Sequence, residues 1–124
     1  MTTPIAIFGA GGFGREVLQI VLDINSTFTE VQPKWKPLGF IVDTAFLSEN
    51  PIHDLPILGT IDWLRTYPSV HIVIAIGSSA ARRHIAKEIE ALVPNQFATL
   101  IHPRAWLGRN VARGKGSIVC AGSL

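Results

Sequence analysis

The sequence is poor in the residues that covalent and metal cross-links need. It has a single cysteine, Cys120, among 124 residues, which excludes an internal disulfide and leaves no cysteine pattern for a zinc site. We therefore expect no metal. A lone thiol also suits a reducing compartment, so we expect a cytoplasmic protein.

Charge and long apolar runs are scarce too. Charged residues make up 16% of the chain and the net charge is +2, which gives no electrostatic argument for a nucleic-acid partner. No apolar run approaches the roughly 20 residues of a membrane-spanning helix. The first apolar run, at Ile5, is broken at Gly9, so the sequence predicts neither a signal peptide nor a membrane span.

Apolar residues, at 48%, are abundant enough to form the core of one globular domain. Short apolar runs typical of buried strands alternate with two segments of helical spacing. Their apolar residues are expected on one buried face each: Val17, Leu18, Val21 and Ile24 in the first, and Ile85, Ile89, Leu92 and Val93 in the second. Strands are predicted at 4–8, 38–42, 57–58, 71–76 and 97–101, and helices at 13–25, 60–67 and 80–93. The polar, proline-containing segments 27–36 and 44–56 are predicted to be loops. This alternation predicts an α/β fold: a Rossmann-like parallel sheet with flanking helices.

Three loops follow the predicted strands and point to a ligand site. They are the glycine loop GAGGFG at 9–14, the pair Val42 and Asp43, and the turn at 77–79. Ligands of such sheets bind outside the carboxyl ends of the strands, where these loops would meet. Glycines let a phosphate approach the backbone, and the following helix directs its positive end there. The alternative is a tight turn that binds nothing.

The end of the chain has a different period. In sixes it is IHPRAW, LGRNVA, RGKGSI and VCAGSL, with a large residue first in each six, at Ile101, Leu107, Arg113 and Val119. This pattern is typical of a β-solenoid, although Arg113 does not fit an inward position. The alternative is a glycine-rich loop. We therefore divide the chain into a Rossmann-like domain at 1–101 and the beginning of a hexapeptide-repeat β-helix at 102–124. Because stacked repeats need a neighbour or a cap, we expect a longer protein beyond Leu124 or a covering subunit.

Four motifs together resemble a known family, the sugar O- and N-acyltransferases of the NeuD and PglD type, which act in sialic-acid and bacillosamine pathways. They are GAGGFGRE, GFIVD, IAIGSSAARR and LIHPRAWLG. The resemblance implies a Rossmann-like domain that binds a UDP- or CMP-linked amino sugar, followed by a left-handed β-helix that forms a homotrimer. Acetyl-CoA would lie between neighbouring β-helices. The histidine that acts as general base would lie beyond Leu124, so no catalytic residue is assigned here.

The same resemblance implies a set of substrate-binding residues. They are Gly11, Gly12, Phe13, Val42, Asp43, Gly77 and Ser78. The chain departs from the family at three of these positions. Phe13 stands where histidine is frequent and Ser78 where asparagine is common, while of an acidic pair at 42–43 only Asp43 is present.

Two other functions stay open from the residues. An NAD(P)-dependent oxidoreductase also uses a glycine loop, but Asp43 lies about 30 residues beyond it rather than the usual roughly 20. A non-catalytic module that binds nucleotide sugars would share every motif. Arg82 and Arg83 could approach a phosphate or could be solvated helix residues. Our leading hypothesis is the substrate-binding part of a sugar acetyltransferase.

Overall fold

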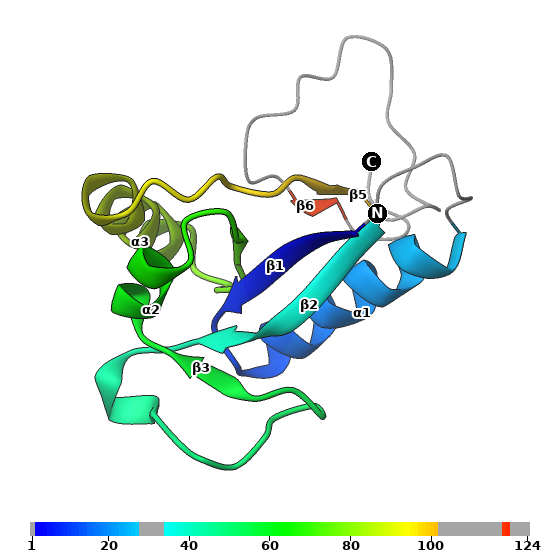
Figure 1. Cartoon of the computed structure of the whole chain (residues 1–124), viewed down its shortest axis with the longest axis horizontal. Helices are drawn as coiled ribbons and strands as arrows, with labels where there is room; N and C mark the ends of the chain where they lie inside the picture. Colours follow the sequence, from blue (N-terminus) through cyan, green and yellow to red (C-terminus); the bar gives the residue numbers. More distant parts are fainter. Residues whose placement is uncertain (1, 28–33, 102–117, 120–124) are drawn as a thin grey trace, which may run out of the picture.

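The computed structural model describes residues 2–27, 34–101 and 118–119, and Figure 1 shows their arrangement. The elements are β1 (Thr2–Phe8), α1 (Gly12–Thr27), β2 (Lys34–Ile41), the 3-10 helix η1 (Thr44–Phe46), β3 (Ile57–Gly59), α2 (Ile61–Thr66), β4 (His71–Ile74), α3 (Ser79–Leu92), β5 (Leu100–Ile101) and β6 (Ile118–Val119).

The main sheet is parallel throughout, and its strands lie in the order β3-β2-β1-β4. The first strand in sequence is therefore a central strand, flanked by β2 on one side and β4 on the other. α1 connects β1 to β2 and α2 connects β3 to β4, while the long connection from β2 to β3 contains η1. Parallel neighbours need such crossover connections. The predicted Rossmann-like α/β fold is confirmed.

The two faces of the sheet carry different helices, because side chains alternate along each strand. Ile5 and Ile7 of β1 pack in one buried cluster with α1. Ala6 and Phe8 point to the other face and pack with α2 and α3. The helices thus form a layer on each side of the sheet (Figure 1).

The helical spacing of the sequence located the buried faces well. In α1 all four expected residues are buried: Val17, Leu18, Val21 and Ile24. In α3 Ile85 and Ile89 are buried as expected. Leu92 was expected on the same face, and this was wrong, since it is 46% exposed. The helix ends there, and Val93, expected on the same face, follows in an extended conformation and is buried as expected.

Three segments differ from prediction by more than two residues, at one end or in the interior. β2 begins at Lys34, inside the segment expected to be a loop. The expected loop at 44–56 contains η1, which holds a fixed turn next to Asp43. The predicted strand at 97–101 does not form a regular strand of the main sheet. Phe97 makes one isolated parallel bridge to Ile72, while Leu100–Ile101 pairs with β6.

The pairing of β5 with β6 joins residues 18 apart, Leu100 with Ile118 and Ile101 with Val119, in parallel. A three-sided coil of six-residue repeats predicts this separation. The rest of the predicted β-helix at 102–124 lies outside the described residues, as do Leu107, Arg113 and Cys120. Within the described ranges no helix is both long and apolar enough to cross a membrane.

Candidate functional site

The carboxyl ends of three parallel strands are held together by backbone hydrogen bonds. The N–H of Gly9 donates to the carbonyl of Ile41 at 2.9 Å, and the N–H of Ala75 donates to the carbonyl of Phe8 at 2.8 Å. These bonds join the loops that follow β1, β2 and β4 at one edge of the sheet. The predicted meeting of the three loops is confirmed at the level of the backbone.

The glycines of the loop after β1 divide into two kinds. Gly9 has a φ of +108°, and a Cβ on it would lie 2.7 Å from the carbonyl oxygen of Ala75. Gly14 is equally constrained, because a Cβ there would meet the carbonyl of Gly9. Gly11 and Gly12 have nothing within 4 Å of such a Cβ. The packing of the chain therefore requires Gly9 and Gly14, and leaves open space beside Gly11 and Gly12.

The first turn of α1 faces that open space with unpaired backbone donors. The first hydrogen bond within the helix runs from Arg15 N–H to the carbonyl of Gly11 at 3.1 Å. The N–H groups of Gly12, Phe13 and Gly14 precede it and have no partner within the helix. No acidic side chain lies in the first turn. The positive end of the helix dipole is therefore not neutralised locally, which favours an anion such as phosphate.

A cavity of about 430 Å³ lies at this edge of the sheet. That volume is within the range of small-molecule sites. Ten residues line it: Phe8, Gly9, Ala10, Gly11, Val42, Asp43, Phe46, Ile52, Ile57 and Ile76. Gly11, Val42 and Asp43 were predicted from the sequence. The others come from strand ends, from the glycine loop, from η1 and from the segment that follows η1.

Among the described residues that line this cavity, Asp43 is the one with an ionisable side chain. It is exposed and occupies the N-cap position of η1, yet its side chain makes no capping hydrogen bond. Its carboxylate is thus available to accept hydrogen bonds from a hydroxyl or an N–H of a ligand. Val42 is buried and its N–H donates to the carbonyl of Gly59 at 3.0 Å, so it contributes a wall to the cavity.

The other predicted site residues do not line the cavity. Phe13 is partly buried and packs against the α1 side of the core. Ser78 caps α3, since its Oγ accepts a hydrogen bond from the N–H of Ala81 at 3.3 Å. Gly77 is exposed with free space around it. Their role in binding, and that of Gly12, stays a prediction.

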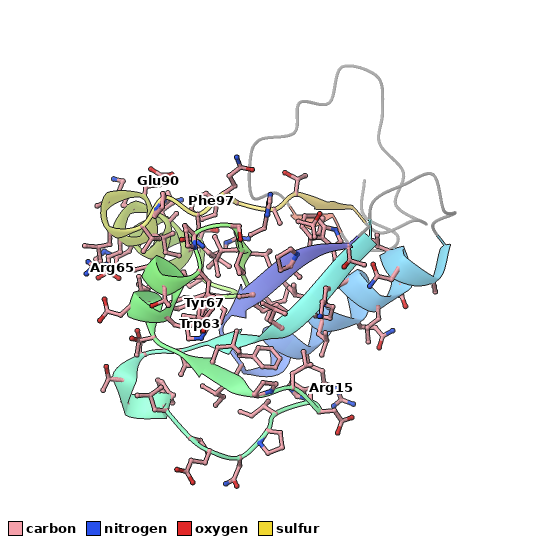
Figure 2. All side chains as sticks on the ribbon, viewed as in Figure 1. Arg15, Trp63, Arg65, Tyr67, Glu90 and Phe97 are labelled. Atoms are coloured by element: carbon pink, nitrogen blue, oxygen red, sulfur yellow. The ribbon has the colours of Figure 1, made fainter. Side chains whose placement is uncertain are left out.

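Arg82 and Arg83 line a separate cavity of about 360 Å³ beside α3, together with Ser79, Glu90 and Phe97. Figure 2 shows the Glu90 and Phe97 side chains on this side of the molecule. Neither arginine lines the cavity of the glycine loop.

The tryptophans that the structure describes pack against other aromatic rings and line neither cavity. Trp35 packs against His71, and Trp63 of α2 packs against Tyr67, the residue that follows this helix (Figure 2).

Sequence reasoning missed Phe46 and Ile52 because they lie in the segment 44–56, which was expected to be a surface loop. Ile57 lies in the short strand predicted at 57–58, but it was not predicted to be a site residue. An isolated aromatic residue three positions after Asp43 was the available signal. Over residues 2–27, 34–101 and 118–119, no group of three or more His, Cys, Asp or Glu side chains is placed to hold a metal ion.

The chain matches the model of the PglD N-terminal domain family over residues 4–89. It is also 25% identical over 120 residues to a UDP-N-acetylbacillosamine N-acetyltransferase of Bacillus subtilis (strain 168). That alignment covers 94% of this chain and 51% of the relative.

Two kinds of solved structure share the fold. A mutant of perosamine N-acetyltransferase from Caulobacter crescentus, solved in complex with CoA and GDP-perosamine, superimposes with a TM-score of 0.75 at 19% identity. The superposition covers 96% of this chain and 52% of that protein. The acetyltransferase domain of PglB from Neisseria gonorrhoeae, in complex with acetyl coenzyme A, gives 0.72 at 25% identity and covers 98% of this chain and 54% of that one. The chain spans about half the length of each relative that it matches.

Proposed function

The chain belongs to the PglD N-terminal domain family, and from that premise we propose that it is the nucleotide-sugar-binding part of an acetyltransferase. The enzyme would transfer acetyl from acetyl-CoA to the amine of a nucleotide-linked amino sugar. N-acetylation is favoured over O-acetylation because the named relatives are N-acetyltransferases.

One observation carries the proposal: the cavity between Gly11 and Asp43. Its glycine end offers backbone N–H groups and a helix N-terminus to a diphosphate. Its other end offers the Asp43 carboxylate to ribose hydroxyls or to an N–H of the base. The apolar wall between them suits the flat part of a nucleoside.

Acetyl-CoA would supply the acetyl group at the β-helix, the predicted part of the protein at and beyond 102–124. By family resemblance, a histidine beyond Leu124 would take the proton from the attacking amine. The described residues would then serve only to bind and orient the nucleotide sugar. The 18-residue spacing of the β5–β6 pair supports a β-helix after this domain. A homotrimer and a cytoplasmic location are part of the same proposal.

Ligand binding to the chain tests the proposal. A ligand present at about 100 times its Kd stabilises a folded protein by about 2.7 kcal/mol, which shifts Tm by several degrees. We expect UDP-linked amino sugars to give this shift and NAD to give none. A shift with NAD and none with any nucleotide sugar would replace the proposal by an oxidoreductase.

Acetyl transfer needs a second experiment, because a non-catalytic module would pass the binding test as well. A chain extended beyond Leu124 along its reading frame is expected to acetylate the same sugar that the 124-residue chain binds. The 124-residue chain itself should bind the sugar without acetylating it. An extended chain that binds but never acetylates would support a binding module.

A further inference from the structure

Phe46 is the most exposed large apolar residue of those described, with a relative accessibility of 68%, yet it lines the cavity beside Asp43. An aromatic ring left in water at the edge of a concave site forgoes the free energy of burial. Ligand pockets are lined mainly by hydrophobic and aromatic side chains, so a ring at this place suits contact with a bound molecule.

The turn that carries Phe46 also fixes its position relative to Asp43. The N–H of Phe46 donates to the carbonyl of Asp43 at 2.9 Å, and the N–H of Leu47 donates to the carbonyl of Thr44 at 3.3 Å. These two bonds form η1 directly after β2. One tight turn therefore presents a flat ring and a carboxylate to the same cavity.

The chemistry of the cavity at this end selects the kind of group that fits. The lining contributed by Ala10, Ile52, Ile57 and Ile76 is apolar, and Asp43 carries the only charge among the described lining residues. A flat heterocycle that carries hydroxyl or N–H donors at its edge satisfies both features. The phosphates of the same ligand would lie at the glycine loop after β1, the strand next to β2.

We propose that Phe46 stacks on the nucleobase of the bound nucleotide sugar. The inference rests on the proposed function, since it assumes a nucleotide in this cavity, but it assigns to Phe46 a role that the function alone does not require. Stacking on an aromatic ring depends little on which base is present. Phe46 therefore contributes affinity for the base, and recognition of its identity falls to hydrogen-bonding groups.

The test compares Phe46→Ala with Leu47→Ala, its matched control. Leu47 is the next residue, is 49% exposed, and does not line the cavity. Isothermal titration calorimetry on the 124-residue chain measures Kd for UDP and, by competition, for ribose 5-phosphate, which lacks the base.

We expect Phe46→Ala to raise Kd for UDP about tenfold, which is about 1.4 kcal/mol. Kd for ribose 5-phosphate should change less than twofold, Leu47→Ala should bind UDP as the parent does, and Phe46→Trp should restore binding.

Each contrary outcome has its own meaning. An unchanged Kd for UDP in Phe46→Ala overturns the stacking role while the proposed function stands, and so does an equal loss for UDP and ribose 5-phosphate. If the unaltered chain binds no nucleotide, the proposed function fails and the role of Phe46 fails with it. Because Phe46 is exposed, its substitution should leave the unfolding midpoint unchanged, and circular dichroism checks this.

Discussion

The carbonyl oxygen of Ala75 lies 2.7 Å from the point where a Cβ on Gly9 would stand. This proximity arises because the end of β1 turns sharply where β4 ends beside it, and the N–H of Ala75 donates to the carbonyl of Phe8 at 2.8 Å. Gly9 is therefore a requirement of the fold, and a sequence motif that looks functional is in part structural.

Gly9→Ala is expected to destabilise the protein without any ligand present. The methyl group would clash with Ala75, and the φ of +108° is unfavourable for alanine. Together these effects cost about 2 to 4 kcal/mol. Chemical denaturation followed by circular dichroism measures the change. Gly77→Ala is the control, since its Cβ has no neighbour within 4 Å, and it should stay within about 0.5 kcal/mol. Equal stability of the two variants would contradict the argument.

Gly11→Asp and Gly11→Asn form a matched pair that separates charge from size. Both residues cap helices well, so neither should destabilise α1, which begins at Gly12. A carboxylate at this place would repel a diphosphate, and we expect Gly11→Asp to bind UDP at least tenfold more weakly than Gly11→Asn. Uridine, which has no phosphate, should bind both variants equally. Equal UDP affinities would place the phosphates away from Gly11.

Asp43→Ala tests the other end of the cavity. If the carboxylate accepts hydrogen bonds from the ribose, its loss should raise Kd for UDP about tenfold, the range of a hydrogen bond to a charged group. A UDP analogue without the 2′ and 3′ hydroxyls should then bind Asp43→Ala and the unaltered chain alike. Glu49→Ala is the control, because Glu49 is an exposed carboxylate of the same segment that does not line the cavity. A retained preference for the hydroxyls in Asp43→Ala would show that Asp43 contacts another part of the ligand.

Ser78→Ala should act on stability. Its Oγ accepts the N–H of Ala81, and loss of such a cap costs about 1 kcal/mol. Ser79→Ala is the matched control, since the Oγ of Ser79 accepts only from the exposed Arg82 side chain at 3.3 Å. Thermal unfolding distinguishes the two. A Ser78→Ala variant that keeps full stability and loses UDP binding would instead support the substrate contact that the family resemblance implies.

The fold class, and the edge of the sheet where the site lies, could be predicted from the amino-acid sequence alone. Helical spacing identified Val17, Val21 and Ile24 as the buried face of α1, and the apolar runs identified the central strands. These features can be predicted from the sequence because the spacing of apolar side chains reflects which face of a helix or strand is buried. The order of the motifs also led to the family that the comparison found over residues 4–89.

Tertiary structure decided which residues of the loops form one cavity. The sequence could not distinguish the structural Gly9 from the open Gly11, because the difference depends on the carbonyl of Ala75, which is far along the chain. Likewise it could not show that Phe46 lies beside the cavity, because a 3-10 turn and the neighbouring strand ends bring it there. Contacts between segments that are distant in sequence produce no periodic pattern of apolar residues in the local sequence, so they are seen only in the folded chain.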